Sequence, residues 1–103
     1  MVKCVTMIDK EGHQLYFDYI EIDDNPSVIC HLDIKKWNKT TKKEILKDIY
    51  DTLSAEPLPK YVVWDGKDIK FFKFISMAGF LSTGYHTKDY GNEDEYLFKW
   101  CRG

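Results

Sequence analysis

Two polar side chains in one strand-like segment are the first candidates for chemistry. His31 and Asp33 lie two positions apart in residues 28–34, where apolar residues occupy the alternate positions. Side chains two apart project from the same face of a strand, so this imidazole and this carboxylate would share a surface, and either could act as a general base. The same alternation is typical of any half-buried strand with one polar face, and we favour that simpler interpretation.

A basic segment follows at once. Five lysines lie between positions 35 and 43, around a single tryptophan, Trp37. Ammonium groups interleaved with an aromatic ring suit the phosphates of a cofactor or a nucleic acid. The simpler interpretation is a solvated first turn of the helix. Because lysines are slightly unfavourable at the positive end of a helix dipole, we weigh this interpretation and a binding role about equally. Trp37 is therefore a candidate partner-binding residue.

An acidic loop near the C-terminus is the third candidate surface. Four carboxylates and one tyrosine lie close together there: Asp89, Tyr90, Glu93, Asp94 and Glu95. A charged loop with an aromatic tip could dock on a basic protein surface. Loops of this composition are more often simply solvated, so these residues are candidates for partner binding and no more.

Composition excludes several classes of protein. A formal net charge of −2 gives no general attraction to nucleic acid or to an anionic membrane. Three widely spaced cysteines form neither a disulfide framework nor a Cys-x-x-Cys motif, and no histidine has a partner at metal-ligand spacing, so we predict no metal site. The N-terminus lacks an export signal, and no apolar run is long enough to cross a bilayer, which predicts a cytoplasmic protein.

The hydrophobic pattern predicts a single domain over residues 1–103, with six strands and two helices. Strands are expected at residues 2–9, 14–23, 28–34, 61–64, 81–87 and 95–100, and helices at 41–53 and 68–78. We expect Thr41 and Glu44 to form a capping box, Asp68 to cap the second helix and Gly79 to end it. A bulge is expected near residues 20–22 and a turn at residues 24–27.

The order of these elements predicts the fold class. A helical crossover between two strands implies parallel pairing, whereas the hairpins at both ends of the chain imply antiparallel pairing. We therefore expect an α/β (α+β) domain with a mixed β-sheet, order βββαβαββ, covered mainly on one face by two helices.

The strand–helix–strand–helix order that ends in Gly79-Phe80 resembles the acyl-CoA-binding half of the GNAT acetyltransferase superfamily, in the shortened layout of its small phage-borne members. In that superfamily a glycine-rich loop before the helix holds the cofactor's pyrophosphate on backbone amides. The resemblance makes Asn38, Lys39, Thr40, Thr41 and Lys42 the cofactor-binding positions. Thr40 and Lys42 replace the glycines, and their side chains would crowd the phosphates.

A second departure from the superfamily bears on the reaction. Many GNAT enzymes carry a tyrosine in the second helix, four residues before the glycine, as general acid for the departing thiolate. This chain has Ile75 there, which has no proton to donate. If the chain is an enzyme, the resemblance places His31 and Asp33 beside the acyl site, as bases for an amine.

These observations favour a degenerate GNAT-like domain that binds a host protein and inhibits or modulates it, with no cofactor and no standard acetyltransferase reaction. If the chain is phage-encoded, it would act in the host cytosol. The alternative is an acetyl-CoA-dependent N-acetyltransferase with a non-standard phosphate loop. A weaker alternative is a nucleic-acid-binding protein that uses Trp37 and the lysines around it. The strongly apolar second helix also leaves a homodimer open.

Overall fold

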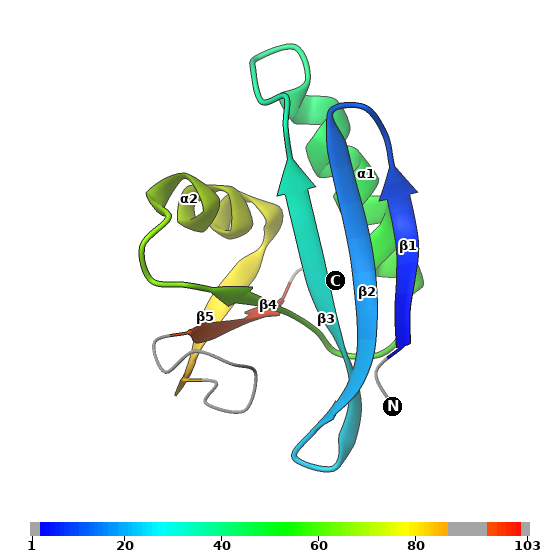
Figure 1. The fold of residues 1–103 in the computed structure, drawn as a ribbon, viewed down its shortest axis with the longest axis vertical. Helices are drawn as coiled ribbons and strands as arrows, with labels where there is room; N and C mark the ends of the chain where they lie inside the picture. The colour runs from blue at the N-terminus through cyan, green and yellow to red at the C-terminus, as the bar shows by residue number, and fades with distance from the viewer. Residues whose placement is uncertain (1–2, 87–94, 102–103) are drawn as a thin grey trace.

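The computed structural model describes residues 3–86 and 95–101. The chain has the predicted α+β fold, a six-stranded mixed sheet with two helices in the order βββαβαββ (Figure 1). The strands are β1 (Lys3–Asp9), β2 (His13–Ile22), β3 (Asn25–Ile34), β4 (Lys60–Trp64), β5 (Phe80–His86) and β6 (Tyr96–Trp100), and the helices are α1 (Lys42–Ala55) and α2 (Ile69–Ala78). Their bounds differ from the predicted ones by a few residues at most, and positions 2 and 87 of the predicted strands lie outside the described residues.

The sheet consists of two antiparallel halves. Its strand order is β1-β2-β3-β4-β6-β5, in which the first three strands form one half and the last three form the other. The halves are joined by the parallel pairing of β3 with β4, which involves only Val28 with Lys60 and Ile29 with Tyr61. Beyond these pairs β3 and β4 diverge (Figure 1).

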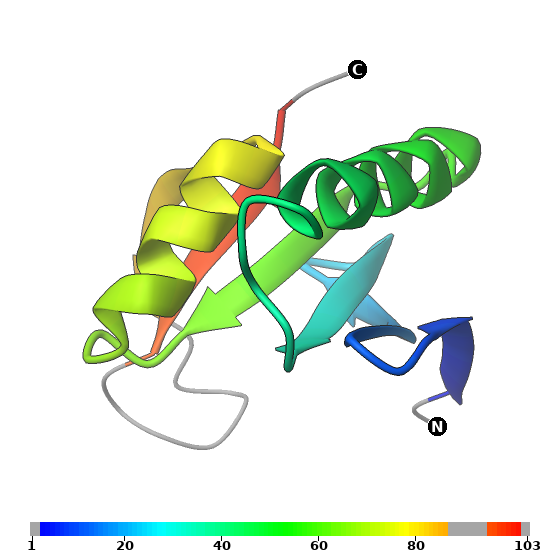
Figure 2. The same ribbon diagram turned by 90° about the horizontal axis from the view of Figure 1, so that it is seen from above.

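Both helices lie on the same face of the sheet, as the pattern predicted (Figure 2). Helix α1 buries Ile45, Ile49 and Leu53, and α2 buries Phe74, Ile75 and Ala78. Because strand side chains alternate between faces, every second strand residue meets these helices. The strand residues of this core are Ile8, Leu15, Phe17, Val28, Cys30, Val62, Phe80, Phe98 and Trp100. No helix within the described residues is both long and apolar enough to cross a membrane.

The two predicted ends of α2 are confirmed. The Asp68 side chain accepts a hydrogen bond from the Phe71 N–H (3.0 Å), which satisfies one of the free amides of the first turn. Gly79 ends the helix in the left-handed region, at φ 104°, where a side chain is disfavoured.

The predicted capping box of α1 is wrong. Thr41 has helical backbone angles and makes no side-chain cap. Instead the Asn38 side chain accepts hydrogen bonds from the N–H groups of Thr40 (2.8 Å) and Thr41 (3.0 Å). The chain already turns before Thr41, so the capping acceptor lies three residues upstream. Glu44 consequently contacts Lys10 rather than the helix start.

The predicted turn between β2 and β3 lies slightly too late in the chain. The chain reverses at Asp23 and Asp24, whose φ angles are 51° and 65°, and β3 begins at Asn25. A two-residue turn with both φ angles positive matches the twist of the flanking strands, and aspartate tolerates this conformation.

The predicted bulge also lies elsewhere. β2 pairs with β3 without interruption from His13 to Ile22, so residues 20–22 contain no bulge. The register instead shifts in β1, between Thr6 and Ile8 where it pairs with β2, and again in β5, between Ser82 and His86 where it pairs with β6.

Candidate functional site

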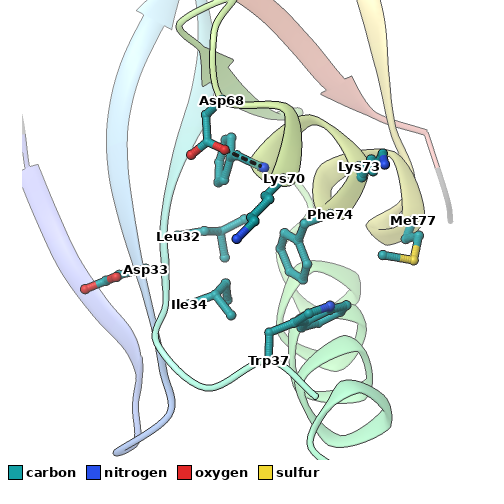
Figure 3. A pocket seen from close by; sticks show the side chains of 10 residues that line it. Leu32, Asp33, Ile34, Trp37, Asp68, Lys70, Lys73, Phe74 and Met77 are labelled. Carbon is teal, nitrogen blue, oxygen red and sulfur yellow. Dashed lines mark hydrogen bonds between the residues drawn. The ribbon is translucent and has the colours of Figure 1, made fainter. Parts of the chain in front are cut away.

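A groove opens where β3 diverges from β4. It lies between the end of β3, the segment that leads into α1, and one side of α2, and has a volume of about 600 Å³ (Figure 3). This volume is within the usual range for ligand sites. The apolar side chains that line it are Leu32, Ile34, Trp37, Phe71, Phe74 and Met77.

The end of β3 presents an open backbone edge to this groove. The Val28 N–H donates to the Pro59 carbonyl (2.9 Å), so the backbone groups of Val28 point toward β4. In an antiparallel strand these groups alternate between the two sides, so those of Leu32 and Ile34 also point away from β2. Within residues 3–86 and 95–101 no strand pairs with Leu32 or Ile34 on that side.

The groove is lined by two lysines and two carboxylates, so its formal charges balance. Its two carboxylates are engaged, because Asp68 caps α2 and Asp33 lies 3.9 Å from Lys35 and points away from the groove (Figure 3). In the described part of the chain, neither Lys70 nor Lys73 has an ion pair or a side-chain hydrogen bond. The Lys70 side chain points toward Leu32 and Ile34 (Figure 3).

Trp37 lies at one end of the groove. Its ring meets that of Phe74 at nearly a right angle, with 5.1 Å between the ring centroids. This contact joins the segment before α1 to α2. The neighbouring lysines have partners of their own, since Lys36 pairs with Glu11 (2.7 Å) and Lys35 lies near Asp33. Trp37 thus lines an apolar groove rather than the centre of a basic patch.

The two candidate bases, His31 and Asp33, lie on the opposite face of the sheet. Val28 and Cys30 point into the core beneath the helices, so the alternate residues of β3 project from the helix-free face. There His31 is hydrogen-bonded to Asp18 on the neighbouring strand β2. Neither base is directed into the groove between β3 and α2.

A smaller pocket of about 420 Å³ lies on that helix-free face. Its polar residues are His31 with three carboxylates, those of Asp18, Asp65 and Glu95. Glu95 is the one residue of the predicted acidic surface that the structure describes. The other four, Asp89, Tyr90, Glu93 and Asp94, lie outside the described residues.

The backbone N–H groups of the predicted phosphate loop already make hydrogen bonds within the loop. The Asn38 side chain accepts hydrogen bonds from the N–H groups of Thr40 and Thr41. The Asn38 backbone carbonyl accepts one from the N–H of Lys42 (2.9 Å). The Thr41 hydroxyl donates to the Lys36 carbonyl (2.9 Å), and Lys39 is exposed. A phosphate at this helix start would first have to displace Asn38, because the amides it needs already have acceptors.

An ionic cluster that the sequence did not indicate ties β2 to α1. His13 is only 5% exposed, and its Nε2 lies 2.9 Å from Asp48 Oδ2, while Lys10 Nζ lies 2.7 Å from the same oxygen. Burial alone would raise the pKa of Asp48, but the hydrogen bonds and charges of Lys10 and His13 outweigh it and lower that pKa. The sequence held one signal for this cluster. Asp48 follows Ile45 by three positions, which places a carboxylate beside the apolar face of the helix.

The buried thiol and the buried amine of the chain are poorly suited to nucleophilic chemistry. Burial raises the pKa of Cys30 to about 12, so its thiolate is scarce at neutral pH. Burial lowers the pKa of Lys60, which favours the nucleophilic neutral amine. The residue is only 8% exposed, however, and its nitrogen lies 5.1 Å from the centroid of the Trp100 ring, so little of it is open to a substrate. Ile75, at the position of the catalytic tyrosine of the resembling enzymes, is fully buried.

Residues 3–86 and 95–101 contain no group of three His, Cys, Asp or Glu side chains placed to hold a metal ion. Comparison of the chain with protein-family models, curated proteins and solved structures finds no match.

Proposed function

We propose that the chain is a protein-binding domain that holds a segment of another protein in the groove between β3 and α2. The observation that carries this proposal is the open edge of β3 beside an apolar wall, at Leu32 and Ile34. An unpaired strand edge is a ready acceptor for another chain, and folds usually cover or blunt such edges. If the chain is phage-encoded, as the GNAT-like order of elements suggests, the partner is a host protein that the domain inhibits or modulates.

The proposal excludes the standard acetyltransferase reaction. His31 and Asp33 project from the far face of the sheet, so neither reaches a ligand held in the groove. Ile75 is buried and has no proton for a departing thiolate. The Asn38 side chain already accepts hydrogen bonds from the backbone N–H groups that a pyrophosphate would require. These three features support a scaffold that binds without catalysing acyl transfer.

Site-specific photo-cross-linking tests the proposal. Trp37 and Tyr50 are aromatic side chains with the same exposure, 40% and 41%, but only Trp37 lines the groove. Replacing each in turn with p-benzoylphenylalanine, in cells where the protein acts, should give a discrete protein adduct from position 37 and none from position 50. Equal yields from both positions, or no adduct from position 37, would contradict binding in the groove.

An acetyl-CoA-dependent enzyme is the second candidate, because the order of elements resembles the acyl-CoA-binding half of the GNAT superfamily and the groove lies beside the segment that leads into α1. Calorimetry with acetyl-CoA distinguishes the two candidates, and we expect no saturable heat. The Asn38→Gly variant sharpens the test, since it frees the amides of Thr40 and Thr41. Micromolar binding by the unaltered chain, strengthened in this variant, would favour the enzyme.

A further inference from the structure

We propose that Gly12 and Thr41 are positioning residues, which hold Trp37 in place at the end of the groove between β3 and α2. The proposal rests on the proposed function, in which Trp37 meets the bound segment, and it names the residues that set this contact. Gly12 and Thr41 both lie outside the lining of the groove. They act through Lys36 and Asn38, the two neighbours of Trp37 in the chain.

Trp37 has little of its own to hold it in place. Within residues 3–86 and 95–101, neither its backbone nor its indole makes a hydrogen bond, and its ring contacts one other ring, that of Phe74. Trp37 lies between β3 and α1, outside any helix or strand, and it is 40% exposed. The direction of its side chain therefore depends on how the backbone on either side of it is fixed.

The first anchor is the hairpin between β1 and β2. The Gly12 carbonyl accepts hydrogen bonds from the N–H groups of Lys35 (2.8 Å) and Lys36 (3.1 Å), so this hairpin fixes the chain just before Trp37. Glycine leaves room for this approach, since a Cβ at position 12 would lie 3.3 Å from the Cβ of Lys36. The φ angle of Gly12 is not in the left-handed region, so its backbone would accept a side chain and only the crowding would be new.

The second anchor is the Thr41 hydroxyl. It donates to the Lys36 carbonyl (2.9 Å) and accepts from the Asn38 N–H (3.0 Å), so one side chain holds the chain on both sides of Trp37. The Asn38 side chain in turn accepts from the N–H groups of Thr40 and Thr41, which ties the segment to the start of α1. The Trp37 side chain is thus ordered before a partner arrives, and an ordered side chain loses less freedom on binding.

The indole N–H signals in NMR spectra of the full chain test this proposal in the absence of any partner. The Trp37 signal is the one that disappears in Trp37→Phe. The other two tryptophans, Trp64 and Trp100, donate to backbone carbonyls at the two ends of α2, so their signals serve as internal references. Gly12→Ala should move the Trp37 signal and leave the references in place, and Gly12→Val should move it further.

Two double variants test whether the effect passes through Lys36. Each is compared with the single variant at position 36, which also lacks the ion pair between Lys36 and Glu11. Added to Lys36→Gly, the Gly12→Ala change should leave the Trp37 signal unmoved, because the alanine has no Cβ to meet. Added to Lys36→Ala, it should still move the signal. Equal displacement in both backgrounds, or displacement in neither, would contradict crowding against Lys36.

Substitutions of similar shape test the Thr41 hydroxyl. Thr41→Val removes both hydrogen bonds and should move the Trp37 signal, whereas Thr41→Ser keeps them and should not. Thr40→Val is the matched control, because the Thr40 hydroxyl makes no hydrogen bond within the described part of the chain. A Trp37 signal that moves equally in Thr41→Val and in either of the other two variants would refute the role of the hydroxyl.

Cross-linking in the same variants separates this proposal from the proposed function. With p-benzoylphenylalanine at position 37, Thr41→Val should lower the adduct yield and Thr41→Ser should retain it. If the Trp37 signal stays in place in both Gly12→Ala and Thr41→Val, the positioning role is wrong, whatever position 37 cross-links. If the signal moves but position 37 of the otherwise unaltered chain gives no adduct, the proposed function fails and the positioning role stands. If Gly12→Val unfolds, Gly12→Ala and the Thr41 variants decide.

Discussion

The two partners of Asp48 differ much more in burial than in distance, and this difference predicts which contact stabilises the fold. Asp48 Oδ2 lies 2.9 Å from His13 and 2.7 Å from Lys10, but the His13 side chain is 6% exposed and that of Lys10 is 49% exposed. Water and salt screen the exposed pair. A hydrogen bond to a charged group away from water contributes about 1.5–3 kcal/mol. A double-mutant cycle with alanine at His13 and Asp48 should therefore give a coupling energy near the lower end of this range, about 1.5 kcal/mol.

The assay is urea unfolding of the two single variants and the double variant, repeated with Lys10→Ala in place of His13→Ala. At neutral pH the His13–Asp48 coupling should exceed the Lys10–Asp48 coupling, and added salt should reduce only the latter. The pKa of Asp48 is lower in the folded chain than in the unfolded one. Its contribution is therefore complete above the unfolded pKa and is lost as the pH falls through the folded pKa, where both couplings should shrink. A Lys10 coupling equal to or larger than that of His13 would refute the reasoning from burial.

Three further predictions concern α2 and can be checked by the same unfolding assay. Ile75→Ala should lower the free energy of unfolding by about 2–5 kcal/mol, because Ile75 is fully buried; a loss no greater than that of an exposed site such as Ser76→Ala would count against this core assignment. Asp68→Ala should cost about 1 kcal/mol and Asp68→Asn much less, since asparagine can still accept the Phe71 N–H. Gly79→Ala should cost about 1–2 kcal/mol at φ 104°, with a smaller loss for Gly79→Asn; equal stability of the alanine variant would show that the helix end relaxes.

Features that depend on residues close in sequence were predictable. The ends of α2 follow from Asp68 and Gly79, whose capping partners on the helix lie within four residues. Thr41 failed as a cap because its hydroxyl is hydrogen-bonded to the Lys36 carbonyl and its own N–H is held by the Asn38 side chain. The β2–β3 turn was placed too late because proline and asparagine are strong turn formers, although Asp23 and Asp24 adopt the turn conformation.

Features that depend on distant residues were not predictable. The groove exists because β3 and β4 pair over so short a stretch, and nothing local to Leu32 or Phe74 determines that length. The alternation in β3 placed His31 and Asp33 on one face, but it could not show that the helices cover the other. His13 and Asp48 are 35 positions apart, so their contact follows only from the packing of α1 against β2.

The short parallel ladder between Val28–Lys60 and Ile29–Tyr61 is a seam between two otherwise self-contained antiparallel sheets. Bending at this seam would change the width of the groove between β3 and α2 without requiring a break in the antiparallel ladders of either half. A segment held between β3 and α2 would contact both sides of the seam and so would oppose that bending.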